Sequence, residues 1–169
     1  MAEPEKEPGG EIGALLATLD SQRGHVLGVL EGLPDEALRR AVLPSGWTCL
    51  GLIRHLALDV ERFWFRQVMT GEQVEPDEFG DDGWQVRPEV PAAAVLDLYR
   101  REIELADKII TATSLEAPPA WWPDFFPPAF HLDNLRQVLL HVIAETACHA
   151  GHLDIARELI DGRTWLILT

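Results

Sequence analysis

Four long segments of the chain repeat their apolar residues with the period of an α-helix, and this pattern most restricts the possible folds. The segments cover about 11–31, 45–70, 91–113 and 133–161. No stretch of useful length alternates apolar and polar residues as a half-buried strand does. Helices of roughly 20 to 28 residues are about 30 to 40 Å long, which fits a bundle. We therefore predict an all-α fold, an antiparallel four-helix bundle.

Residues with capping chemistry mark the ends of these helices. Ser45 or Thr48 can cap the second helix, because a hydroxyl accepts an N–H that otherwise has no partner. Asp133 can cap the fourth helix in the same way. Gly71 and Gly162 follow the second and fourth helices, where glycine commonly ends a helix.

The chain length predicts one domain over residues 11–169, preceded by a disordered polar tail over residues 1–10. Two connections of about 20 residues are long for a bundle, and loops of that length are often functional. The first contains DEFGDDGW (77–84), which lacks the ligand spacing of a calcium loop and is predicted to be solvated. The second contains WWPDFFPPAF (121–130), which predicts a lid over a pocket, a dimer anchor or a loop packed on the bundle. The apolar tail at 164–169 is predicted to pack back on the bundle.

Charge and composition argue against several classes of protein. The net charge of −14 repels phosphate backbones and anionic membranes, so we expect neither nucleic acid nor membrane as a partner. No run of about 18 uncharged apolar residues predicts a transmembrane helix, and the N-terminus has no signal-peptide pattern. Cys49 and Cys148 are predicted to be free thiols in a reducing cytoplasm. The abundance of Arg, Ala, Gly and Pro indicates a high-GC bacterial gene.

The stretch AETACHAGHLD (144–154) places titratable residues inside the apolar pattern of the fourth helix. At about 100° per residue, Glu145 falls at the centre of the apolar stripe, and His141, His149 and His152 lie within about 40° of it. An unpaired buried carboxylate costs several kcal/mol, so Glu145 needs a proton, a cationic partner or a metal. Glu145 and His149 are one turn apart and can reach a common ion.

The stretch LIRHLALDVERFWF (52–65) of the second helix offers the third partner. His55 lies at the edge of its apolar face, and Asp59 follows one turn later. Glu61 is predicted to point to the opposite, solvated side. These positions bring His55 toward the polar groups of the fourth helix.

Two imidazoles and a carboxylate from His55, Glu145 and His149 suit Zn²⁺ and also Fe, Ni or Mn. Three protein ligands leave open positions for water or substrate, which is typical of a catalytic site. His152 is an alternative to Glu145 as a ligand. A buried Glu–His network without metal is the competing interpretation.

The remaining histidines and the second cysteine have smaller predicted roles. His141 and His152 are placed to hold a ligand by hydrogen bonding. His25 and His131 are interpreted as structural. Cys148 is predicted to be a small buried hydrophobic residue.

The segments SGWTCLGLIRHLALDVERFWF and LRQVLLHVIAETACHAGHLDIARELIDG resemble the DinB-like superfamily, and the actinobacterial uncharacterised branch most of all. The resemblance covers about residues 15–162. It implies a four-helix bundle with a divalent-metal site, whose ligands carry over to His55, Glu145 and His149. Many members have His at all three positions, and a Glu at the position of Glu145 resembles mycothiol-dependent maleylpyruvate isomerases. The sequence HAGH places His152 where many members have Gln.

The resemblance also implies an activity, because the superfamily includes thiol S-transferases that use mycothiol or bacillithiol. A metal lowers the pKa of a bound thiol, and the thiolate then attacks an electrophile. Asp59 and His152 flank the implied site and are the candidate bases for the thiol proton. The implied partners are a small-molecule thiol, an electrophile and a second copy of the chain. The alternative is a non-catalytic metal- or ligand-binding bundle involved in stress response.

Overall fold

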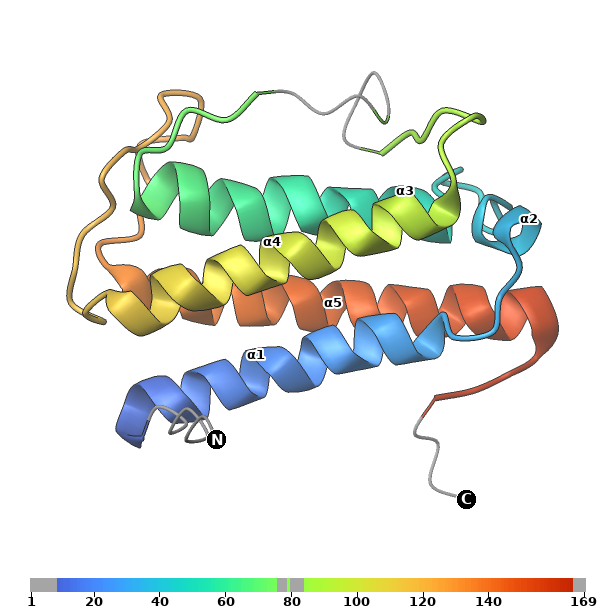
Figure 1. Cartoon of the computed structure of the whole chain (residues 1–169), viewed down its shortest axis with the longest axis horizontal. Coiled ribbons are helices and arrows are strands. Elements are labelled where there is room, and N and C mark those ends of the chain that lie inside the picture. The colour runs from blue at the N-terminus through green and yellow to red at the C-terminus, as the bar shows by residue number, and fades with distance from the viewer. Residues whose placement is uncertain (1–8, 76–78, 80–83, 166–169) are drawn as a thin grey trace, which may run out of the picture.

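The computed structural model describes residues 9–75, 79 and 84–165, and the regular elements in those ranges are all helices. In chain order they are α1 (Gly10–Val29), α2 (Asp35–Leu38), α3 (Cys49–His55), η1 (Leu56–Met69), α4 (Ala92–Ala112) and α5 (Leu135–Asp161). The predicted all-α bundle is confirmed, with α3 and η1 forming one continuous rod (Figure 1). The predicted tail lies outside the described residues except for its last two positions, and α1 begins at the second of these.

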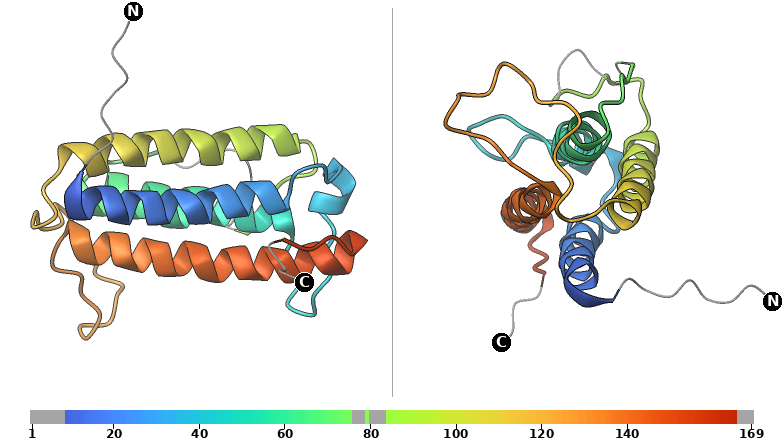
Figure 2. Two further views of the ribbon diagram at one scale, coloured as in Figure 1. Left: turned by 90° about the horizontal axis from the view of Figure 1, so that it is seen from below. Right: turned by 90° about the vertical axis from the view of Figure 1, so that its left-hand side faces the viewer.

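The helix directions follow from the long connection between η1 and α4. The end of η1 and the start of α4 lie at opposite ends of the bundle, so η1 and α4 run parallel to each other (Figure 1). The first helix α1 and the last helix α5 run in the opposite direction, also side by side (Figure 2). The expected antiparallel order therefore holds between α1 and η1 and between α4 and α5, but not for η1 and α4.

The helix ends agree closely with the capping residues in the sequence. The Thr48 hydroxyl accepts a hydrogen bond of 3.0 Å from a backbone N–H in the first turn of α3. Asn134 caps α5, and not the predicted Asp133, because the helix begins one residue later than expected. Gly162 ends α5 in the left-handed conformation, with φ of 77°.

The second half of the long rod, η1, is a π-helix. Its hydrogen bonds run over five residues and widen each turn relative to the α-helix. The buried side chains come in adjacent pairs every four residues, a longer repeat than the 3.6 of an α-helix. These residues are Leu56, Ala57, Val60, Glu61, Trp64, Phe65, Val68 and Met69.

Glu61 is buried, so the prediction that it is solvated is wrong. Its side chain accepts two hydrogen bonds of 2.7 Å from the Arg23 guanidinium, which also contacts Asp107 at 2.7 Å. The wheel drawn with the α-helical angle misplaced Glu61, because the wider turn of η1 brings it into the bundle interior. The interaction links α1, η1 and α4.

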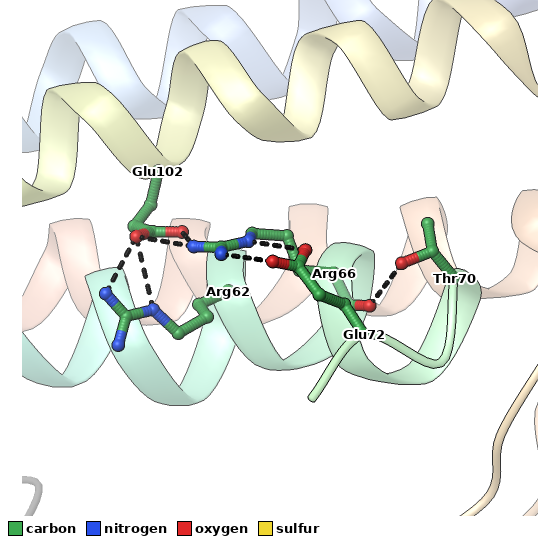
Figure 3. A network of polar contacts seen from close by, with 5 residues as sticks. All are labelled: Arg62, Arg66, Thr70, Glu72 and Glu102. Atoms are coloured by element: carbon green, nitrogen blue, oxygen red, sulfur yellow. Dashed lines mark hydrogen bonds and ion pairs between the residues drawn. The ribbon is translucent and has the colours of Figure 1, made fainter. Parts of the chain in front are cut away.

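A second buried carboxylate, Glu102 of α4, holds η1 from the other side (Figure 3). It accepts hydrogen bonds from Arg62 at 2.8 Å and from Arg66 at 2.9 Å. Arg66 also pairs with Glu72 at 2.5 Å, and its carbonyl accepts the Thr70 hydroxyl. The π-helix is therefore fixed to α4 along its second half, which sets the position of the side chains it presents to the site.

The C-terminal end of the described chain packs against α1. The indole of Trp165 stacks on His25, with ring centroids 5.4 Å apart. The start of the apolar tail thus packs back as predicted, while residues 166–169 lie outside the described part of the chain. None of the helices in the described ranges combines the length and apolar character that crossing a membrane demands.

Candidate functional site

The structure brings the predicted residues of the second and fourth helices together. His55 ends α3 and Asp59 lies in the first turn of η1, and the His55 Nδ1 is 2.8 Å from an Asp59 carboxylate oxygen. On α5, the Glu145 Oε2 lies 3.6 Å from the His149 Nε2. The His55 and His149 rings meet edge to face, with centroids 5.1 Å apart. The three predicted ligands therefore lie side by side between the α3–η1 rod and α5.

Glu145 does not lie at the centre of the buried face, in contrast to the prediction. Its side chain is 42% exposed, while the next residue, Thr146, is fully buried and donates its hydroxyl to the Val142 carbonyl. The apolar stripe of the sequence includes Leu159, which is exposed, so the centre of that stripe is not the centre of the buried face. Glu145 lies at the edge of the core, where its carboxylate remains accessible.

His149 is held in its neutral form. Its pKa is lowered to about 4, mainly by burial and also by the neighbouring His55, although the Glu145 carboxylate acts in the opposite direction. The pKa of His141 is likewise lowered by burial. A neutral imidazole keeps the lone pair that a metal ligand needs.

The side chains of His55, Glu145 and His149 are of the types that bind a divalent metal. The distance between one pair of them, Glu145 and His149, also fits such an ion. Two ligands of a tetrahedral zinc ion lie about 3.4 Å apart at bond lengths of about 2.1 Å, close to the distance between Glu145 and His149. Because a carboxylate only accepts hydrogen bonds, Asp59 makes Nδ1 of a neutral His55 the protonated nitrogen and leaves Nε2 with a lone pair. Within residues 9–75, 79 and 84–165, no three His, Cys, Asp or Glu side chains together have the geometry of a metal site.

The other predicted residues separate into those near the site and those away from it. The Nδ1 atoms of His152 and His149 are 3.4 Å apart, so His152 contacts the site from α5. His141 packs against Trp64, with centroids 4.7 Å apart, and lines a pocket beside Glu145. His25, paired with an aspartate, and the exposed His131 lie outside the site.

Both cysteines are free thiols, but their environments differ. Cys49 is buried at the start of α3, and burial raises its pKa to about 11. Cys148 is exposed, so the prediction that it is a buried hydrophobic residue is wrong. It occupies the outer face of α5, on the solvent side of the stripe that contacts the bundle.

A pocket of about 410 Å³, here called the aromatic pocket, opens beside His55 and Glu145. Its wall is formed by η1, α5 and the loop before α5, which extends beyond the bundle (Figure 2). The lining residues are His55, Asp59, Phe63, Trp64, Phe125, Phe126, Phe130, His141 and Glu145. The aromatic segment of the second long loop therefore lines a pocket mouth, as one of its predicted roles requires.

A second pocket of about 550 Å³, here called the loop pocket, lies across Trp84 from His55. Its wall includes the polar side chains of Arg39, Ser45, Thr48 and Gln85. The Trp84 indole lines this pocket and stacks on the His55 ring, which lines the aromatic pocket, so this pair of rings connects the walls of the two pockets.

The sequence model of the mycothiol-S-transferase family (MST) matches residues 14–162, which contain all the residues of the site. The chain belongs to the mycothiol-S-transferase family. This result confirms the resemblance to the DinB-like superfamily, of which the family is a part. No curated protein matches the chain.

Sequence reasoning missed three aromatic residues around this candidate site. Trp84 covers one face of His55, Trp47 lies beside His152, and Phe63 lines the aromatic pocket. Trp47 lies just before the start of α3, and Trp84 lies at the end of the acidic segment. No helical pattern indicates the partners of a residue at either position. Phe63 belongs to the apolar repeat of the segment LIRHLALDVERFWF, and in the π-helix it lines the pocket.

Proposed function

We propose that this chain catalyses the transfer of a low-molecular-weight thiol, mycothiol, to an electrophilic carbon. The family match over residues 14–162 carries the proposal. The contacts among His55, Glu145 and His149 support it, because they place two imidazoles and a carboxylate beside two pockets.

The residues that would hold a divalent metal are His55, Glu145 and His149. A metal bound there would lower the pKa of a coordinated thiol, so that the sulfur carries its negative charge near neutral pH. Zinc suits this donor set best, and Ni, Fe or Mn also accept imidazole and carboxylate ligands. The neutral form of His149 and the fixed tautomer of His55 favour this role.

The two candidate bases have different surroundings. One oxygen of Asp59 is bonded to His55, so we assign Asp59 as a positioning residue that orients this imidazole. His152 is exposed beside His149, and we assign it as the acceptor of the thiol proton. In the overall reaction the S–H bond breaks, a sulfur–carbon bond forms, and the leaving group departs with its electron pair.

A second function is favoured by one observation. The aromatic pocket of about 410 Å³ has the size of a small-molecule site and is lined mainly by rings, as expected of a bundle that binds a ligand without catalysis. The predicted homodimer and cytoplasmic location belong to this proposal under either function. Light scattering at micromolar concentration tests the dimer, and a monomer would contradict it.

The decisive experiment combines metal content with turnover. Elemental analysis of protein purified without an affinity tag should show about one divalent metal per chain, and His149→Ala should lose it. The cobalt-loaded protein should develop a sulfur-to-cobalt charge-transfer band when mycothiol is added, and the mixture should consume an alkylating electrophile. Metal-loaded protein that shows neither the band nor turnover would favour the binding function.

A further inference from the structure

The aromatic pocket has one polar end and one apolar end. His55, Asp59 and Glu145 form the polar end, where the proposed reaction takes place. Phe63 and Trp64 of η1 face aromatic residues of the loop at the other end. A molecule in this pocket therefore reaches the site with one end while its body contacts aromatic rings.

The apolar end presents the faces and edges of packed aromatic rings, against which a flat molecule can lie. Trp64 and Phe126 are stacked at 5.7 Å with an interplanar angle of 8°, and Phe63 meets Phe126 edge to face at 6.1 Å. Phe125 lies at the mouth with 72% of its surface exposed. Stacked and edge-to-face rings at such separations gain most from another aromatic ring, and an exposed phenylalanine gains from being covered.

The charges of the pocket are of one sign. Asp59 and Glu145 are carboxylates, and the lining contributed by the described residues includes no lysine or arginine. The net charge of −14 adds a repulsive field around the opening. An anionic ligand would thus lose its hydration and meet two carboxylates, and the double positive charge of a bound metal would be offset by these carboxylates and the thiolate.

The loop pocket offers a different environment on the other side of Trp84. Arg39, Ser45, Thr48 and Gln85 provide hydrogen-bonding groups there. A hydroxyl-rich thiol suits such a wall better than it suits a ring of phenylalanines. This contrast leaves the aromatic pocket for the second substrate.

We propose that the aromatic pocket binds the electrophile, and that it selects flat aromatic molecules without negative charge. The identification of the ligand as the electrophile rests on the proposed function, but binding in the pocket requires neither metal nor thiol. With an arylmethyl halide, the sulfur–carbon bond forms as the carbon–halogen bond breaks. The halide leaves with the electron pair, and the thiol proton passes to His152.

The test uses unreactive naphthalene probes that share one ring system and differ in the charge of a small substituent: 2-naphthylmethanol, 2-naphthylmethylammonium and 2-naphthoate. Each is titrated by calorimetry into the full-length, metal-free and thiol-free protein. We expect the neutral and cationic probes to bind and the anion to bind at least about tenfold more weakly. Equal affinity for anion and neutral probe would overturn the proposal.

Three variants locate the binding. Phe63→Ala should weaken the neutral probe by about tenfold or more, and the milder Phe63→Leu provides the same test if the first variant unfolds. Trp165→Ala removes a partly buried aromatic that stacks on His25 outside the pocket, and it should leave the affinity unchanged. Glu145→Gln should narrow the difference between the anionic and neutral probes. Unchanged binding in both Phe63 variants would refute the assignment of the pocket.

The proposed transferase function and the assignment of the aromatic pocket can be refuted independently of each other. Selective binding of neutral naphthalene probes by a protein without metal or turnover would support the pocket assignment and refute the transferase. Turnover with electrophiles that bear a negative charge, together with equal probe affinities, would refute the pocket assignment alone.

Discussion

The imidazole of His55 lies face to face with the indole of Trp84, with ring centroids 4.1 Å apart and an interplanar angle of 14°. His149 approaches the same imidazole edge to face. Trp84 belongs to the connection between η1 and α4, outside both helices of the site. The connection therefore covers one side of a proposed metal ligand and separates it from the loop pocket.

This stacking makes Trp84 a reporter of the site. Binding of Co²⁺ should quench its fluorescence, because a paramagnetic ion next to His55 would lie within a few ångströms of the indole. Trp84→Phe should lower the quenched fraction of the total emission. Trp165→Phe removes the indole that stacks on His25 instead, so it should raise that fraction. Equal quenching in both variants would place the metal elsewhere.

Asp59→Asn should weaken metal binding by about 10- to 100-fold, because the amide no longer fixes the His55 tautomer. Asp59 is half exposed, so the free energy of unfolding of the metal-free protein should change by less than about 0.5 kcal/mol. Asp154→Asn is the matched control, since Asp154 pairs with His25 at the same distance of 2.8 Å outside the site. Competition with a chromophoric chelator measures the affinity, and equal losses in the two variants would contradict a positioning role.

The stability of the metal-free protein should fall as the pH falls from about 6.5 to about 4. His149 has a folded-state pKa of about 4, against 6.5 for the free side chain. Within this window the His149 side chain binds a proton in the unfolded chain but not in the folded chain. Protonation therefore favours the unfolded chain, and the stability is unaffected by it only above the window. Urea unfolding at a series of pH values should show a shallower slope for His149→Gln. The exposed His131→Gln should keep the slope of the original chain, and parallel slopes for all three proteins would contradict the prediction.

Glu102→Gln should lower the free energy of unfolding by about 3 kcal/mol, because it leaves the largely buried Arg62 without its carboxylate and Arg66 with Glu72 alone. Glu116→Gln removes an exposed partner of Arg136 and should cost less than about 1 kcal/mol. Chemical denaturation monitored by circular dichroism gives both values. Losses of similar size would show that the Glu102 network does not hold η1 to α4.

The sequence predicted the fold and the neighbourhood of the site where local rules apply. Thr48 and Gly162 mark helix ends because capping depends on one or two turns of backbone. The spacing of Glu145 and His149 over one α-helical turn placed them together for the same reason. His55 joined them because the apolar faces of two long helices must pack against each other.

The failures have a common physical origin in features that span more than one helix. The apolar pairs of η1 repeat every four residues, a visible sign of a wider turn, and an α-helical wheel therefore placed Glu61 in solvent. Its partner, Arg23, lies on another helix and has no local signal. Trp84 is likewise fixed by tertiary packing of a long connection that carries no periodic pattern.

The last prediction concerns the two thiols of the chain itself, which must be distinguished from a thiol substrate. Cys148 is exposed, whereas Cys49 is buried and has a pKa of about 11. At pH 8 only about one thousandth of the Cys49 side chain would be the reactive thiolate, even if the reagent could reach it. Iodoacetamide should therefore add once to the native chain and twice to the chain in denaturant, as counted by mass spectrometry. Cys148→Ser should abolish the native adduct and leave transfer of an added thiol unchanged, because the proposed reaction uses no cysteine of the chain. Loss of transfer in Cys148→Ser with metal content retained would instead make Cys148 part of the reaction.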